Sequence, residues 1–333
     1  MKRTVLVGNI SFLFLFALLT VSTVFCALFF GSTFISPEQF RTESGTLSPL
    51  ILSRICRIAT SFTVGGSLAI AGSVYQAVLR NPLADPFILG VSGSAALGTA
   101  LAFITGAAMT SACTIPVFAG AGALAAIVFV LLLGSITARG ESTALLLSGV
   151  ITGTVSSSIL MCLISFAGTT EMCSVTWFML GDLSSADPVL LRFFLFFIPF
   201  PVLLLWLLSP KANALALGDD HARSLGIDPV KTSYFLIILA SLLTAGSVAV
   251  SGIIGFAGLI IPHILRKCGF SDNRKLFPLS FWAGGVFLTL CDLLSRCIFP
   301  EREIPPGVIT SLAGGTLFLW ILYENGKERN RKR

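Results

Sequence analysis

About ten apolar runs, most of them close to 20 residues long, limit what this chain can fold into more than any other feature. A helix of roughly 20 residues crosses the hydrocarbon of a bilayer. The runs are too long and too uniformly apolar for the alternating strands of a β-barrel. The sequence therefore predicts an all-α polytopic membrane protein with about ten transmembrane helices. The first run ends near Phe30, and the others cover residues 58–78, 88–107, 115–136, 143–166, 190–208, 232–250, 253–267, 277–297 and 306–323.

Composition excludes an ordinary soluble domain. Of the 333 residues, 55% are hydrophobic and 11% are charged, whereas charged residues make up roughly 25% of a typical soluble domain. The first run follows Lys2 and Arg3 and could be taken for a signal peptide, but it is longer than the usual apolar core, and no A-x-A-like site follows it. We therefore expect an uncleaved first helix and a single membrane domain over residues 1–333.

The basic residues are distributed unevenly, which indicates the orientation of the chain. With an inside N-terminus, most of the 22 Lys and Arg residues fall in the inside ends and connectors, and five of them lie in the tail KERNRKR. Cytoplasmic segments of membrane proteins carry such an excess. The pattern predicts that both termini are cytoplasmic (N-in, C-in), and it makes the net charge of +6 a topology signal instead of a sign of nucleic-acid binding.

The sequence contains no pattern of catalytic or metal-binding residues. There are two His, His221 and His263, and eight Cys without C-x-x-C or other metal-ligand spacing. A GxxxxGK[ST] phosphate loop is missing, because Val230 stands where the glycine before Lys231 must be. We expect no catalytic site, no metal and no cofactor on this chain, so energy for any driven process must come from elsewhere.

Small residues and a polar turn mark the segment RNPLADPFILGVSGSAALG, residues 80–98. Pro82 and Pro86 prevent an uninterrupted helix here, which predicts a tight loop. The helix that follows is rich in Gly, Ser and Ala, so its backbone can approach neighbouring helices closely. In the helix before the loop, Gly65, Ala69 and Ser73 recur at intervals of four and predict a packing face.

Several long strings, in matching order and spacing, resemble one family of transport proteins: LRNPLADPFILGVSGSAALG, LGDDHARSLGI, SGIIGFAGLIIPHILR and EIPPGVIT. The chain resembles the permease subunits of ABC importers for iron-siderophores, haem and cobalamin, the FecCD type. This resemblance implies a type II ABC importer permease fold in a prokaryotic plasma (inner) membrane. It also implies a homodimer that assembles with two ATP-binding subunits, which hold ATP and Mg, and with one external substrate-binding protein.

The longest inside connector, about residues 211–231, is the predicted coupling segment. From the residues alone, Asp219 and Asp220 could cap a short helix that ends at Gly226, and a solvated helical loop is the plain alternative. The resemblance implies that this segment docks into a groove on the ATPase. The positions that match the family motif are Gly218, Asp219, Ala222, Arg223, Leu225 and Gly226.

Arginines mark the outside. Arg54 and Arg57 fall in an expected polar connector over residues 31–57, and Arg296 follows Asp292 by one helical turn, so the two can pair. The resemblance implies that these three arginines receive acidic residues of the binding protein, and interfacial snorkelling is the alternative. Cys56 stands where the family usually has a proline.

Ser142 and Thr143 begin the predicted fifth helix. They suit a helix N-cap, whereas the resemblance implies a cytoplasmic gate, and both roles are compatible.

The function that fits best is an ATP-driven importer permease for an iron-siderophore or related iron chelate, with cobalamin or haem as alternatives within the family. An ion-coupled secondary transporter would predict mid-membrane ionisable residues and broken helices, and Asp292 is the one candidate. A membrane anchor for a redox enzyme would need paired His, which His221 and His263 are not placed to provide.

Overall fold

The computed structural model of the chain describes residues 2–31, 34, 48–111, 113–137, 142–184, 187–299 and 303–331. Of residues 2–15, 135–137, 142–144, 321, 322 and 324–331, it describes the backbone alone. Every regular element in these ranges is a helix, which confirms the predicted all-α class.

The helices follow one another with short connections. They are α1 (Lys2–Phe29), α2 (Pro49–Val78), η2 (Pro86–Leu89), α3 (Val91–Ile104), η3 (Ala107–Met109), α4 (Thr114–Thr137), α5 (Ser142–Phe166), α6 (Thr169–Leu180), α7 (Pro188–Phe197), α8 (Pro199–Leu207), α9 (Ser209–Ala216), α10 (Asp219–Ser224), α11 (Pro229–Ser251), α12 (Ala257–Lys267), α13 (Asn273–Cys297) and α14 (Pro306–Arg331).

The lengths of the apolar helices fit a multi-pass membrane protein. Within the described residues, six segments are long and apolar enough to cross a bilayer, and three shorter apolar helices accompany them. The predicted number of about ten crossings stays a prediction. The six segments are Pro49–Val78, Thr114–Gly134, Leu145–Phe166, Pro188–Leu207, Pro229–Ser251 and Asn273–Cys297.

Three features differ from the sequence-based expectations. The polar connector expected to reach residue 57 ends earlier, because α2 begins at Pro49, where a missing amide donor costs nothing in the first helical turn. The run 253–267 is not a complete crossing: α12 has 11 residues, about 16 Å of helix, and residues 252–256 before it are irregular. The sequence also gave no indication of α6.

Helix α2 is the centre of the bundle, and its predicted packing face is confirmed. It contacts α13, α11 and α12 and is buried over most of its length. A Cβ atom on Gly65 would overlap the carbonyl oxygen of Gly284 on α13. About two helical turns after Gly65, Ser73 Oγ donates a hydrogen bond to Ser280 Oγ at 2.9 Å. On the same face, about two turns beyond Gly65, a Cβ on Gly72 would overlap the carbonyl oxygen of Gly258 on α12.

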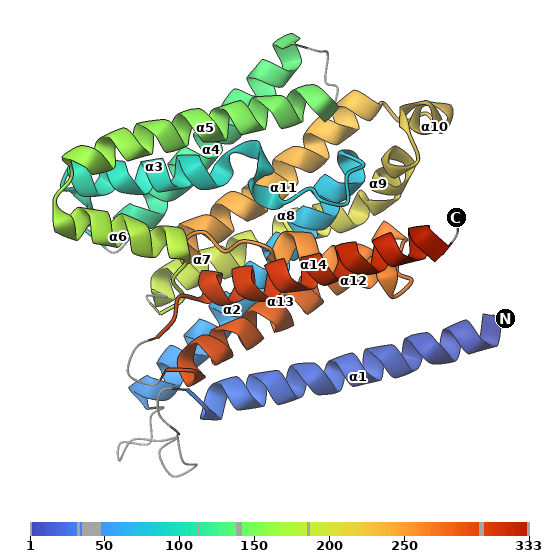
Figure 1. Cartoon of the computed structure of the whole chain (residues 1–333), viewed down its shortest axis with the longest axis horizontal. Coiled ribbons are helices and arrows are strands. Elements are labelled where there is room, and N and C mark those ends of the chain that lie inside the picture. Colours follow the sequence, from blue (N-terminus) through green and yellow to red (C-terminus); the bar gives the residue numbers. More distant parts are fainter. Residues whose placement is uncertain are drawn as a thin grey trace.

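The predicted tight loop and small-residue helix are also confirmed. Asp85 accepts a hydrogen bond from the Phe87 amide at 2.9 Å, and Gly90 turns the chain into α3 with φ of +74°. In α3, a Cβ on Gly98 would overlap the carbonyl oxygen of Phe118 on α4. Helices α3, α4 and α5 form one group beside the central helices, and α1 lies on the opposite side (Figure 1).

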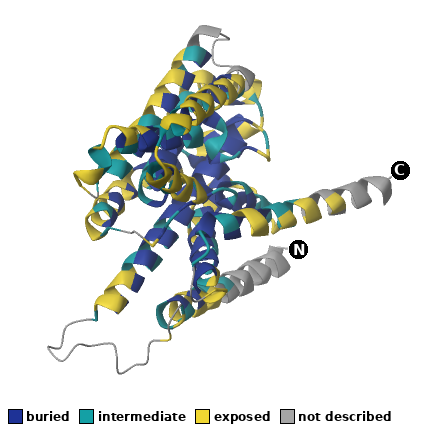
Figure 2. Cartoon of the chain, turned by 60° about the vertical axis from the view of Figure 1, so that its left-hand side comes forward, coloured by how far each residue is buried: buried dark blue, intermediate teal, exposed yellow. Residues whose placement is uncertain are grey.

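The two ends of the bundle differ. The first residues of α1 and the last of α14 lie at the same end as α9 and α10 (Figure 1), which agrees with the prediction that both termini share a side with the coupling segment. Buried residues concentrate in the middle of the molecule (Figure 2). The outward faces carry large apolar side chains, among them Phe193, Phe196 and Phe200, as expected of a surface in contact with lipid.

Gly72→Ala should lower the thermal stability of the purified protein, because a backbone carbonyl oxygen occupies the place of the new Cβ. Overpacking of this kind costs about 1–3 kcal/mol. Gly120→Ala on α4 is the matched control, since its Cβ would meet Ala249 Cβ at 3.6 Å, an ordinary contact. Thermal unfolding in detergent measures both, and equal midpoints would contradict the close contact between α2 and α12.

Candidate functional site

A cluster of charged side chains joins α2, α13 and the segment before α14, at the end opposite to α9 and α10. Arg57 Nε lies 2.7 Å from Asp292 Oδ1, and Arg57 Nη1 lies 2.8 Å from Glu303 Oε2. Asp292 also pairs through Oδ2 with Arg296 Nη2 at 3.1 Å, which confirms the predicted pair one turn apart. We call Arg54, Arg57, Asp292, Arg296 and Glu303 the outer charged cluster.

The outer charged cluster also binds the end of α1. Arg54 Nη1 donates to the carbonyl oxygen of Leu28 at 2.9 Å, and Arg296 Nη1 donates to that of Ala27 at 3.4 Å. The last carbonyl groups of a helix have no partner within the helix, so guanidinium groups satisfy them here. The two arginines therefore attach α1 to α2 and α13.

The burial of these arginines bears on their predicted docking role. Arg54, Arg57 and Arg296 are 9%, 8% and 3% exposed, and Asp292 is fully buried. Much of the charge of Arg57 and Arg296 is therefore satisfied within the chain, and their role in docking stays a prediction. Sequence reasoning found the pair of Asp292 and Arg296 through their spacing, but it missed Glu303, because no spacing rule connects it with Arg57.

A polar hollow of about 400 Å³ opens beside the cluster. Its polar and aromatic lining includes Arg57, Glu303, Trp177, Asp182 and Ser184. The hollow lies where the chain leaves α6 and enters α14. Trp177, which is exposed, and Glu303, which is partly exposed, are among the groups that this hollow offers to a partner.

The predicted coupling segment forms two short helices, α9 and α10. Gly218 separates them with φ of +122°, and Gly226 follows α10 with φ of +73°, which confirms that the helix ends at this glycine. The predicted cap is wrong: Asp219 and Asp220 are the first residues of α10 and make no side-chain cap. Asp220 pairs instead with Arg223 at 3.2 Å.

Apolar side chains project from the coupling segment. Leu217 and Leu225 are 71% and 58% exposed, whereas Ala222 is buried against the protein. Two exposed leucines beside charged residues suit a surface that binds another protein. Of the motif positions, Leu225 is therefore available to a partner, and Ala222 holds the helix against the protein.

A hydrogen-bonded contact attaches the other side of α9 to α13. Asn213 Nδ2 donates to Asp272 Oδ1 at 2.6 Å, and the Asn273 amide donates to Asn213 Oδ1 at 2.9 Å. Asp272 also caps α13 by accepting from the Arg274 amide at 3.0 Å. This backbone bond, with the bond from Asn213, holds the pKa of Asp272 below its ordinary value.

The predicted gate residues are the first of α5, which begins at Ser142. The side chains of Ser142 and Thr143 lie outside the described part of the chain, so neither the cap nor the gate is tested.

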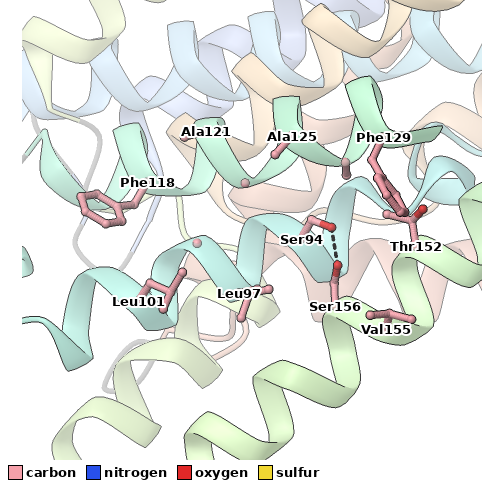
Figure 3. Close-up of a pocket in the computed structure, with 13 residues that line it drawn as sticks. Ser94, Leu97, Leu101, Phe118, Ala121, Ala125, Phe129, Thr152, Val155 and Ser156 are labelled. Carbon is pink, nitrogen blue, oxygen red and sulfur yellow. Dashed lines mark hydrogen bonds between the residues drawn. The ribbon is translucent and has the colours of Figure 1, made fainter. Parts of the chain in front are cut away.

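An apolar groove of about 550 Å³ runs between α3, α4 and α5 (Figure 3). Phe118 and Phe129 lie toward its two ends on α4, and Ser94 and Ser156 are hydrogen-bonded at 2.7 Å within it. The lining carries no charge. It therefore offers no counter-charge to an ionic cargo. Among the described residues, no three His, Cys, Asp or Glu side chains are grouped to hold a metal ion.

Asp292→Asn should destabilise the protein much more than Glu303→Gln. The first change leaves Arg57 and Arg296 buried without the carboxylate that they share, and loss of one partner of a buried pair costs about 3–5 kcal/mol. Glu303 is partly exposed, where loss of a pair costs about 1 kcal/mol or less. Thermal unfolding in detergent compares the two, and equal losses would show that the buried charges do not join α2 to α13.

Comparisons with known proteins agree with the architecture. A profile of the FecCD transport family matches residues 18–324. The uncharacterized ABC transporter permease protein YvrB of Bacillus subtilis (strain 168) is 39% identical over 272 residues, which are 81% of this chain and 77% of that protein. The vitamin B12 import system permease protein BtuC of Salmonella typhi is 33% identical over 321 residues, 96% of this chain and 97% of the relative.

A solved structure of an inward-facing ABC transporter of the metal-chelate type superposes on the chain with a TM-score of 0.83 at 29% identity, covering 93% of this chain and 98% of that one. Permeases of this kind work with ATPase partners and a substrate-binding protein and have no ATPase site of their own. The chain therefore belongs to the FecCD transport family, as the multi-pass inner-membrane permease of a prokaryotic ABC importer.

Proposed function

We propose that this permease imports an iron-siderophore or a related iron chelate, driven by ATP hydrolysis in a separate subunit. The observation that carries the ATP-driven part is the coupling segment, two short helices with Leu217 and Leu225 exposed at the end that holds both termini. The similarity to a metal-chelate transporter supports a chelate as cargo. The similarity to BtuC, a vitamin B12 permease, makes cobalamin the alternative cargo, itself a large metal chelate.

The proposed assembly has two copies of this chain, two ATP-binding subunits and one external binding protein. The cargo passes between the two copies. Helix α5 supports this arrangement, because it carries a row of exposed apolar side chains, Leu147, Val150, Ile151, Val155 and Ile159, that suits a second membrane-embedded copy. The binding protein docks at the end that carries the outer charged cluster and its polar hollow.

In the proposed mechanism this chain forms the pathway for the cargo and transmits the movement of the ATPases to the membrane helices. ATP and Mg bind to the partner subunits, which supply the chemistry of hydrolysis. When ATP draws those subunits together, they move α9 and α10. The helices attached to these two then open the pathway alternately to the outside and the inside.

An ion-coupled secondary transporter is less well supported. The irregular segment 252–256 between α11 and α12 is a broken helix, a feature that such transporters share. However, Asp292 is the carboxylate partner of both Arg57 and Arg296. A proton that bound to Asp292 in each cycle would leave Arg296 buried without a counter-charge and Arg57 with Glu303 alone, at a cost of several kcal/mol.

Deletion of residues 217–227 should abolish association with the ATPase while insertion into the membrane is retained. Residues 217–227 make up α10 and its flanking turns, and they lie outside the helices long enough to span a bilayer. Co-purification with the ATPase measures association, and membrane fractionation measures insertion. As a control, the double variant Leu217→Ser and Leu225→Ser keeps the backbone and removes only the exposed apolar groups. Retention of the full complex after deletion would contradict the coupling role.

The cognate binding protein, purified with its natural ligand, tests the cargo and the docking site together. Absorbance and mass of the released ligand should identify an iron chelate, or cobalamin if the alternative holds. The loaded protein should bind the permease less tightly as salt rises, because charge pairs are screened. Arg54→Glu should weaken this binding. A ligand without a metal centre would contradict the cargo, and binding unaffected by salt or by Arg54→Glu would contradict the docking role.

A further inference from the structure

Arg80 follows α2 in a backbone conformation that long side chains seldom adopt. Its φ of +49° lies in the left-handed region, which costs free energy for a residue other than glycine. From this position Arg80 Nε donates to the carbonyl oxygen of Leu215 at 2.9 Å, and Nη2 pairs with Asp219. One guanidinium group thus contacts the last turn of α9 and the first residue of α10.

These contacts fall at the facing ends of the two helices. Leu215 is in the last turn of α9, where a cation is favoured, and its carbonyl oxygen accepts from the Gly218 amide at 3.0 Å as well as from Arg80. Asp219 is in the first turn of α10, where an anion is favoured. Arg80 therefore binds the junction of the two helices from the membrane side.

The neighbouring acid makes a different contact. The Asp220 side chain is fully exposed. Among the ion pairs of the described residues, Asp220 takes part in one, with Arg223 of the same helix at 3.2 Å. Asp219 and Asp220 carry the same charge on the same helix, yet Asp219 alone is joined to α2. This difference provides a matched comparison.

The end of α2 is tied to other helices as well. Arg266 on α12 is hydrogen-bonded to Gln76 on α2, and α9 is attached to the start of α13 through Asn213. These side chains and Arg80 surround a hollow of about 520 Å³ under the coupling segment. The coupling segment is therefore connected to the end of α2 through Arg80 and to α13 through Asn213.

We propose that Arg80 is a positioning residue that transmits movement of the coupling segment to α2 through its contacts with Leu215 and Asp219. The inference rests on the proposed function, since it takes an ATPase to move the segment. Because α2 is the buried centre of the bundle, its displacement also moves α11, α12 and α13. Loss of the contact should leave ATP hydrolysis in place and reduce the cargo moved per ATP.

The test uses the permease assembled in liposomes with its ATPase and loaded binding protein. Arg80→Gly suits the left-handed backbone and removes only the side chain, so the fold is retained. Arg80→Gly should assemble with the ATPase and hydrolyse ATP, while cargo transported per ATP falls about 5-fold or more, the lower range of coupling between sites. Asp219→Asn should lower cargo per ATP to the same extent. The double variant should fall no further than either single one, because the two residues act as a unit.

Asp220→Asn is the control and should leave cargo per ATP unchanged. An unchanged ratio in Arg80→Gly, with wild-type transport intact, would overturn the inference. So would loss of ATPase association in that variant, because Arg80 would then serve docking and not transmission. Failure of the wild-type assembly to transport with ATP would instead refute the proposed function, so the two failures are distinguishable.

Discussion

Direct backbone contact between α2 and its neighbours is the interaction on which the rest of the structure depends. At Gly65 and Gly284, and again at Gly72 and Gly258, no side chain separates the helices. Inside a bilayer, apolar side chains gain little by leaving lipid for protein, so close van der Waals packing has to hold helices together. These contacts pack the backbone of α2 directly against α13 and α12.

A rigid α2 connects the two ends of the protein. Arg57 near its start belongs to the outer charged cluster, and Arg80 after its end contacts the coupling segment. Twenty-three residues separate them, which corresponds to about 35 Å along a helix. The charged groups at the outer end are buried and paired, whereas the inner end presents exposed apolar and charged groups. The outer charged cluster therefore joins helices within the chain, and the inner end offers exposed groups to a partner.

Local patterns in the sequence predicted much of this architecture. The small-residue stripe of α2, the loop with Pro82 and Pro86, the pair of Asp292 and Arg296 and the end of α10 at Gly226 each depend on residues within a few positions of one another. The early start of α2 at Pro49 and the break at residues 252–256 were harder to predict. The polar residues around Arg54 resemble a connector, although their charges are satisfied by α1 and α13 only in the folded protein.

Contacts between distant residues could not be predicted in this way. The pairs of Arg80 with Asp219 and of Arg57 with Glu303 join residues that are 139 and 246 positions apart in the sequence. The periodicity of a helix relates only residues a few positions apart, so it cannot predict these pairs. The same holds for the irregular segment 252–256, where Ile253 N donates to the carbonyl oxygen of Phe178 on α6 at 3.1 Å. The apolar pattern of residues 253–267 does not reveal that the backbone of this segment is hydrogen-bonded to α6 and not within a helix.

In the proposed function, this permease has no energy source of its own and is driven from its inner end by a separate ATPase. Uptake of the chelate into liposomes that contain the permease, with and without the ATPase, tests it most directly. Accumulation is expected only when the ATPase, ATP and the loaded binding protein are all present. Uphill uptake by the permease alone on a proton or sodium gradient would contradict it.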